Sequence, residues 1–398
     1  MNKIALTAVL GPLVGQAADL FASFDQMAEL GAWLPINHTG LSVLTDEVSV
    51  MLAVEPVFLD HPQRRVLSPC GSMLATPDWI AGSLLQQAVK RGPASAVDWL
   101  EKVMGTERAT GRFVAHVSGV TVAEPMMVSD ELTLLPFEQL PDTNAKRTIV
   151  RSSKMAPGRV HIGHQPQLET AAYFRVPEFP FLVDNVAALA DPFAAAADQH
   201  FEEQIIALTA IEGCRPAIEL RWFEFDDPDL AAVEAGTAFT WRMREGMSAF
   251  QGTMIGPEAA KIMEERRSLD ERSLAIIDLA LGRLNLAMRR LSSGDKAIDA
   301  SICLEALLCS ASEDSSFTSV LKNRAAELLG GTYLEQRSIS KAVAALYILR
   351  GKTVHGRLSR GGRKPTPEDV VATGLPVCAR LIRALLQRGS IPEWPSAK

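Results

Sequence analysis

An arginine and a histidine near the C-terminal end are the residues best suited to chemistry. Arg350 and His355 stand five positions apart in the stretch 347–356. An arginine keeps its charge in water and can hold a phosphodiester through a forked pair of hydrogen bonds, whereas a histidine takes up or releases a proton near neutral pH. The pair therefore suits acid–base chemistry at a phosphate. This spacing also arises by chance in a chain with many arginines, so it is weak evidence for a site by itself. The surrounding elements must support it.

Several residues near this pair could support it. Tyr347 precedes Arg350 by three positions, and Lys352 lies between Arg350 and His355. A basic loop with glycines at 361 and 362 follows. Such a loop is commonly no more than solvated surface, but next to this pair we favour contacts with the phosphate backbone of a nucleic acid. The predicted backbone-binding residues are Arg357, Arg360, Arg363 and Lys364.

Glu305 is the one acidic residue in the otherwise apolar stretch 302–308. Burying an unpaired carboxylate is costly, so we expect it to have a basic partner, and Arg324 or Arg350 would serve. If the partner is Arg350, the carboxylate orients the guanidinium for function. A plain structural ion pair is the other interpretation, and both stay open at the level of sequence.

Charge is distributed unevenly along the chain. The formal net charge is −7, yet residues 270–398 hold 19 Lys and Arg against 13 Asp and Glu, which makes this part +6 and the preceding part −13. A polyanion is therefore tolerated at the C-terminal end and repelled by the front. A chain of 398 residues is too long for one core, and we predict two domains, 1–255 and 256–398.

Cysteine and histidine usage indicates neither a disulfide framework nor a metal site. The five cysteines are scattered without Cys-x-x-Cys spacing, which fits a reducing cytosol, so we expect a cytoplasmic protein. His161 and His164 reproduce the His-Ile-Gly-His letters of class I aminoacyl-tRNA synthetases, but Pro166 follows at once and we interpret the match as coincidence. The remaining histidines are isolated in the sequence. We therefore expect no metal and no cofactor, since a metal-dependent enzyme in the front region would rest on scattered histidines alone.

The N-terminal segment shares some features with a targeting signal. Residues 1–18 resemble a weak signal peptide, with one lysine and an apolar run, but Gly11, Pro12 and Gly15 interrupt the run. No apolar stretch approaches the roughly 20 residues that span a bilayer. We therefore expect no membrane partner.

The apolar pattern predicts an α+β fold: a mixed α/β front with a β-rich middle, followed by an all-α helical bundle. In the front, the pattern predicts helices over 14–30, 77–89, 94–104 and within 183–211, strand-like runs over 41–59, 147–150, 171–176 and 217–225, and an antiparallel pair or meander over 111–137. In the bundle, it predicts helices over 257–267, 268–291, 295–309, 315–329, 339–349 and 367–388, the last two capped by Ser338 and Thr366. Arg350 and His355 would then straddle the end of a bundle helix, about one turn apart.

With these elements in place, the C-terminal third resembles a known family. The stretch 347–356, the acid-containing stretch 302–308 and the run Asn-Arg-Ala-Ala-Glu-Leu-Leu at 323–329 are similar to the HEPN superfamily, and most to the ApeA-type HEPN domains of prokaryotic defence systems. The resemblance covers about residues 270–388. It implies a helical bundle, a homodimer formed through that bundle, and a metal-independent endoribonuclease site that combines Arg350 and His355 across the dimer.

Gly351 departs from the family pattern. Many catalytic members have a polar residue directly after the motif arginine, and this chain has none there. Two hypotheses therefore remain. The first is a ribonuclease effector of anti-phage or abortive-infection defence, in which His355 is the general base, Arg350 stabilises the phosphate, and the front region senses a trigger or restrains the site. The second is a catalytically inactive HEPN-like module that only binds RNA or a partner protein.

Overall fold

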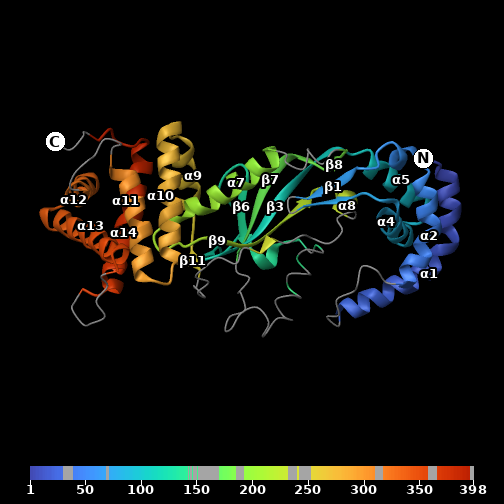
Figure 1. Cartoon of the computed structure of the whole chain (residues 1–398), viewed down its shortest axis with the longest axis horizontal. Helices are drawn as coiled ribbons and strands as arrows, with labels where there is room; N and C mark the ends of the chain where they lie inside the picture. The colour runs from blue at the N-terminus through green and yellow to red at the C-terminus, as the bar shows by residue number, and fades with distance from the viewer. Residues whose placement is uncertain are drawn as a thin grey trace.

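The computed structural model describes residues 1–29, 39–68, 71–141, 143, 146, 150, 170–184, 192–231, 240–241, 252–309, 317–356 and 365–394. Three parts lie in a row along the long axis of the molecule: helices at the N-terminal end, antiparallel sheet in the middle and helices at the C-terminal end (Figure 1). The predicted α+β fold is confirmed, with the sheets in the middle and a C-terminal part made of several helices.

The N-terminal part consists of helices with two short strands between them: α1 (Lys3–Glu29), α2 (Thr39–Ala53), α3 (Pro56–Leu59), β1 (Arg65–Ser68), β2 (Gly71–Leu74), α4 (Pro77–Arg91) and α5 (Pro93–Met104). Helix α4 begins where the sequence predicts. The Thr76 side chain accepts a hydrogen bond from the backbone N–H of Trp79, and Pro77 occupies the first helical position.

Residues 41–59, which we predicted as strand-like, form helices α2 and α3 instead. Thr45, Val48 and Leu52 are all buried, at successive spacings of three and four residues. This helical spacing gives α2 one face that packs against α1 and α4. The β-branched residues of this stretch favour a strand only weakly, and tertiary packing overrides that preference.

Helix α1 is longer than predicted and more apolar. Its segment Lys3–Ala22 has 20 residues and is long and apolar enough, by length and composition, to cross a membrane. This corrects the expectation that no stretch approaches that length. In the structure, Leu6, Leu10 and Ala17 are buried, and α1 contacts α2, α4 and α5.

The middle part is built on a six-stranded sheet in which every pair is antiparallel. The strand order is β10 (Thr240–Trp241), β9 (Ala217–Phe225), β3 (Arg108–Ser118), β7 (Thr170–Pro180), β6 (Leu132–Pro136) and β5 (Met126–Met127). Strand β8 (Leu182–Val183) joins β1 and β2, and β4 (Val120–Thr121) pairs with β11 (Thr253–Met254) in parallel. Within the stretch 111–137, predicted as an antiparallel pair or meander, β5 and β6 do pair antiparallel. Strand β3 does not join them in a meander, because it lies between β7 and β9, two strands that are distant in sequence.

The two faces of this sheet are covered differently. On the inner face, Phe113 and Phe174 stack on Phe201 of helix α7 (Pro192–Ala207), and these residues belong to the main core. On the outer face, Val114 and Trp222 join a smaller second core that includes Phe137 of η1 (Phe137–Gln139). Strand alternation explains the division, since successive side chains point to opposite faces. Two short elements complete this part, η3 (Leu208–Ala210) and α8 (Pro228–Ala231).

Helices alone make up the C-terminal part of the described chain: α9 (Glu258–Arg267), α10 (Glu271–Arg289), α11 (Ser293–Leu308), α12 (Phe317–Leu329), α13 (Tyr333–Val354) and α14 (Pro367–Arg388). Asp270, Ser292 and Thr366 cap α10, α11 and α14 through side-chain hydrogen bonds to backbone N–H groups. The predicted start of α13 is wrong. Ser338 lies inside this helix, which begins one and a half turns earlier at a capping box formed by Thr332 and Glu335.

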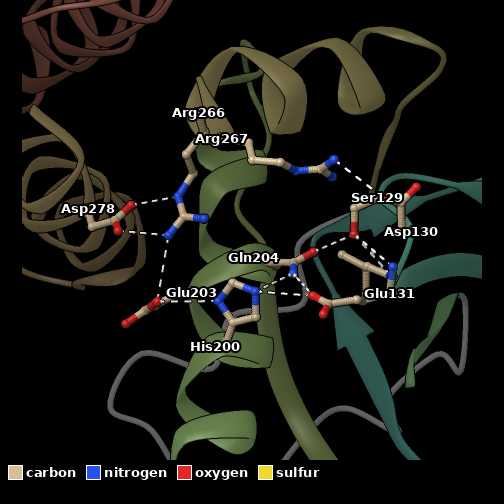
Figure 2. Close-up of polar contacts among 10 residues, drawn as sticks. Ser129, Asp130, Glu131, His200, Glu203, Gln204, Arg266, Arg267 and Asp278 are labelled. Carbon is tan, nitrogen blue, oxygen red and sulfur yellow. Dashed lines mark hydrogen bonds and ion pairs between the residues drawn. The ribbon is translucent and has the colours of Figure 1, made fainter. Parts of the chain in front are cut away.

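A polar network joins the sheet to the first two C-terminal helices (Figure 2). Arg266 of α9 donates two hydrogen bonds of 2.7 Å to the carboxylate of Asp278 on α10, and its guanidinium lies 3.6 Å from the carboxylate of Glu203 on α7. Arg266 is only 7% exposed. The pairing therefore ties α7, α9 and α10 together at the point where the sheet-containing part meets the bundle.

The same network continues to the turn before β6. His200 of α7 lies 3.2 Å from the carboxylate of Glu131, and Gln204 donates to that carboxylate while it accepts a 2.8 Å hydrogen bond from Ser129 (Figure 2). Side chains from four separate elements thus meet at this junction. We refer to Ser129, Glu131, His200, Glu203, Gln204, Arg266 and Asp278 as the junction network.

Candidate active site at the C-terminal end of helix α13

Helix α13 carries Arg350 in its last turns and ends at His355. The backbone N–H of His355 donates to the carbonyl of Gly351 at 3.1 Å, and His355 is the C-terminal capping residue. Gly356 follows with φ of 64°, a conformation that glycine adopts without strain and that stops the helix. The predicted placement of the pair at a bundle helix end is confirmed.

The Arg350 guanidinium is held over an aromatic ring rather than by a carboxylate. Its central carbon lies 5.4 Å from the centroid of the Tyr347 ring, one turn earlier on α13, and Arg350 is half-buried. Such stacking attracts a cation to the ring face and leaves the N–H groups at the guanidinium edge available. Within the described residues, no acidic side chain lies within 4.0 Å of Arg350.

Glu305 acts on Tyr347, the residue whose ring Arg350 stacks on. Burial raises the pKa of Tyr347, and the Glu305 carboxylate raises it further through its charge and a hydrogen bond with the hydroxyl. The expected direct ion pair between Glu305 and Arg350 is not among the contacts of the described residues. Arg324, the other expected partner, donates to the carbonyl of Leu308 at 2.7 Å and stacks over Trp394. Glu305 can therefore position the ring on which the arginine rests.

Helix geometry separates the positions of His355 and Arg350 around α13. Residues five positions apart on an α-helix are separated by about 140° around its axis. His355 and Lys352 are both exposed, and Ile348, seven positions before His355 and on the same side, is 53% exposed. The arginine and the histidine of one chain therefore leave α13 in different directions.

Gly351 has open space around it. A Cβ atom added at this position would meet no atom within 4 Å outside the helix's own backbone, so packing does not require a glycine here. A polar side chain, as in the family pattern, would fit without displacing a neighbour. The missing side chain is thus a property of this sequence and not a consequence of crowding.

The N-terminal ends of two other helices support the end of α13. A Cβ atom added at Gly294, in the first turn of α11, would lie 2.7 Å from the side chain of Thr353. The neighbouring Ser293 hydroxyl donates to Glu368 of α14 at 3.0 Å. This close packing holds in place the end of α13 that carries the arginine and the histidine, and catalysis at a phosphate needs such positioning.

Some predicted site residues fall outside the described part of the chain. These are the basic-loop residues Arg357, Arg360, Arg363 and Lys364, and also His161 and His164. Among the residues that the structure does describe, no group of three or more His, Cys, Asp or Glu side chains is arranged to hold a metal ion. Two of the histidines that are isolated in the sequence have acidic partners, because His61 contacts Asp184 and His200 belongs to the junction network.

Comparison with known proteins identifies no relative of this chain. No family model matches the chain, and searches of curated proteins and of solved structures find no match.

Proposed function

We propose that this protein is a metal-independent endoribonuclease whose site is built from Arg350 and His355. The observation that carries the proposal is the arrangement at the end of α13: a half-buried arginine stacked on Tyr347 with no acidic partner among the described residues, and an exposed histidine at the helix terminus. A cation that is fixed but not neutralised by the protein suits a phosphate ligand. The family resemblance directs the proposal to RNA.

In the proposed reaction, neutral His355 removes the proton from a ribose 2′-hydroxyl. The 2′-oxygen then attacks the adjacent phosphorus in line with the leaving 5′-oxygen, while the Arg350 guanidinium stabilises the negative charge that develops on the phosphoryl oxygens. The P–O5′ bond breaks, the leaving oxygen takes up a proton, and a 2′,3′-cyclic phosphate remains. No metal ion is needed for any of these steps.

The proposed site is shared between two copies of the chain. Residues five positions apart leave a helix about 140° apart around its axis, and a second copy related by two-fold symmetry could supply a His355 that faces Arg350. Two exposed apolar residues of α13, Ile348 and Val354, are 53% and 57% exposed and lie beside the pair. Covering them in a homodimer would favour association through the bundle.

One experiment tests the activity directly. Full-length protein is incubated with total RNA in EDTA, and the fragments are examined for cyclic-phosphate ends. Arg350→Ala and His355→Ala are each expected to reduce cleavage by about 10²–10⁴-fold, because each removes a group that acts in the transition state. Lys341→Ala, an exposed position on the same helix, is the matched control and retains cleavage. Undiminished cleavage by both site variants would show that the nuclease lies elsewhere.

A complementation test addresses the shared site. When the two inactive variants are mixed and allowed to exchange, a mixed dimer contains one intact pair if Arg350 and His355 come from different chains. Activity should then recover to about a quarter of the wild-type value, since half of the dimers are mixed and each has one intact site. No recovery, despite exchange shown by a size-tagged copy, would place both residues of a site in one chain.

Gly351 favours a second function, an RNA- or protein-binding module without catalysis. Its open surroundings make the alternative testable, because Gly351→Asn introduces the missing polar group without a clash. If the natural chain binds RNA in a gel shift but yields no fragments, and Gly351→Asn yields fragments, the natural protein is the binder. The front region, 1–255, would then carry the recognition that we otherwise assign to trigger sensing in defence against phage.

A further inference from the structure

A second cluster of charged residues lies on the outer face of the six-stranded sheet, far from α13 in sequence. The strand register places Glu224 of β9, Arg112 of β3 and Arg175 of β7 directly opposite one another in one row across three strands. Tyr173, two residues from Arg175, extends from the same face in the next row. We refer to Arg112, Tyr173, Arg175 and Glu224 as the outer-face cluster.

Glu224 is satisfied mainly by neutral donors. Its Oε1 atom accepts hydrogen bonds from Trp222 Nε1 at 2.9 Å and from the Thr143 hydroxyl at 2.8 Å. The contact with Arg112 is longer, 3.4 Å between Arg112 Nη2 and Glu224 Oε2. The carboxylate therefore engages one edge of the guanidinium and leaves the rest of it to other partners.

Two donors in the cluster are buried without a partner. Arg112 Nε and the Tyr173 hydroxyl are both inaccessible to solvent and have no hydrogen-bond partner among the residues that the structure describes. The Arg112 guanidinium carbon lies 4.6 Å from the Tyr173 ring centroid, so the two donors are close to each other. Burial raises the pKa of Tyr173 to about 12, so the hydroxyl remains a hydrogen-bond donor even at alkaline pH. A buried donor without a partner is destabilising, so both donors favour a bound group that supplies acceptor oxygens.

Arg175 adds positive charge at the same place. In an antiparallel pair the Cβ atoms of directly opposite residues lie about 5 Å apart, and like charges there repel each other. Arg175 is exposed, and within the described residues no acidic side chain lies within 4.0 Å of it. The cluster thus holds two arginines against one glutamate, in a front region whose net charge is strongly negative.

We propose that the outer-face cluster binds a small ligand through an oxyanion group, a phosphate or a carboxylate. Such a group supplies acceptor oxygens for Arg112 Nε and the Tyr173 hydroxyl, and its charge relieves the repulsion between Arg112 and Arg175. Glu224 and Thr143 link the cluster to the chain segment that follows η1. This gives the front region a ligand site of its own, whether or not the α13 site cleaves RNA.

The test measures thermal unfolding of the full-length protein with inorganic phosphate, citrate or adenosine monophosphate, each compared with sodium chloride at equal ionic strength. We expect at least one of the three to raise the midpoint by about 2 °C or more at 10 mM. A larger effect of phosphate and the monophosphate identifies a phosphoryl ligand, and a larger effect of citrate identifies a carboxylate ligand. Midpoints that follow ionic strength alone for all three overturn the proposal.

Two variants assign the effect to the cluster. Tyr173→Phe removes only the unpartnered hydroxyl, so the ligand-free protein should unfold at the wild-type temperature or slightly above, while the ligand-induced shift falls by at least half. Arg175→Gln removes an exposed charge and should also reduce the shift. Arg108→Gln, an exposed arginine on β3, is the matched control and should keep it. Wild-type shifts in both cluster variants would place the anion elsewhere and overturn the assignment.

Discussion

Arg266 and Arg350 show two opposite ways in which this chain places a partly buried arginine. Arg266 in the junction network is 7% exposed and makes two 2.7 Å hydrogen bonds to Asp278, with Glu203 nearby. Arg350 is half-buried, stacks on Tyr347 and has no acidic partner within 4.0 Å among the described residues. The first charge is neutralised inside the protein and serves its structure. The second charge has no neutralising carboxylate among the described residues, which is the basis of the binding role proposed for Arg350.

The outer-face cluster lies between these extremes. Arg112 has one carboxylate contact at 3.4 Å, one buried donor without a partner, and a second arginine opposite it. If the proposed binding roles hold, the pairing of an arginine, more than its burial, separates a structural role from a binding role. Substitutions test whether that distinction holds.

The largest expected effect is on stability, at the junction network. Arg266→Ala removes the cation between Asp278 and Glu203, and the two carboxylates then repel each other in a partly buried site. We expect the free energy of unfolding to fall by about 2–4 kcal/mol, measured by urea denaturation of the full chain. Arg350→Ala, by contrast, should change it by less than about 0.5 kcal/mol while it abolishes RNA cleavage.

Arg272→Ala is the matched control for the junction, because this arginine is exposed on the first turn of α10. It should change the free energy of unfolding by no more than about 0.5 kcal/mol. If Arg350→Ala proved as destabilising as Arg266→Ala, both arginines would be structural and the comparison would fail.

Substitutions at two glycines of the bundle, Gly374 and Gly351, are expected to change stability by an intermediate amount and in opposite directions. A Cβ added at Gly374 of α14 would overlap the side chain of Leu346, which is fully buried, so Gly374→Ala should destabilise by about 1–3 kcal/mol. Gly351→Ala meets open space inside a helix and should stabilise by about 0.5–1 kcal/mol. Thermal unfolding of the two variants measures both signs. Destabilisation by Gly351→Ala would show that the end of α13 needs a glycine after all.

The smallest effect concerns the alkaline stability of the outer-face cluster. The folded-state pKa of Tyr173 is raised from 10 to about 12, so the unfolded chain loses this proton first as the pH rises. Ionisation of Tyr173 therefore leaves stability unchanged below about pH 10 and lowers it between about pH 10 and 12, where the unfolded chain ionises and the folded protein does not. Wild type should therefore lose about 1–2 kcal/mol more than Tyr173→Phe between pH 8 and 11. Equal losses in urea unfolding at the two pH values would mean that this hydroxyl is not buried.

Elements with strong local signals were predictable from the sequence. Thr366 followed by Pro367 marks the start of α14, and the apolar stripe of residues 268–291 marks α10 to within three residues. The position of Arg350 and His355 at a helix end was also predictable, because Gly356 stops the helix after a run without strand-like alternation. Caps and stop signals act between neighbours in sequence, so they can be read without the fold.

Other features depend on contacts between distant segments and could not be predicted. Residues 41–59 form helices because α1 and α4 bury one side of them. Strand β3 takes the centre of the sheet because β7 and β9 come from much later in the chain. The junction network and the outer-face cluster each combine residues more than 60 positions apart. No local sequence pattern predicts such groups, because no single residue in them has an unusual sequence context.

By itself, the sequence determined which residues could do chemistry at the end of α13, the charge difference between the two parts of the chain, and the class of the fold. Residue type, net charge and short-range periodicity are properties that exist before folding. Only the tertiary structure shows that Glu305 acts on Tyr347, the residue whose ring Arg350 stacks on, and that Arg112 and Arg175 lie directly opposite each other on neighbouring strands. Those outcomes follow from strand register and helix packing, which are set by the burial of apolar surface across the whole molecule.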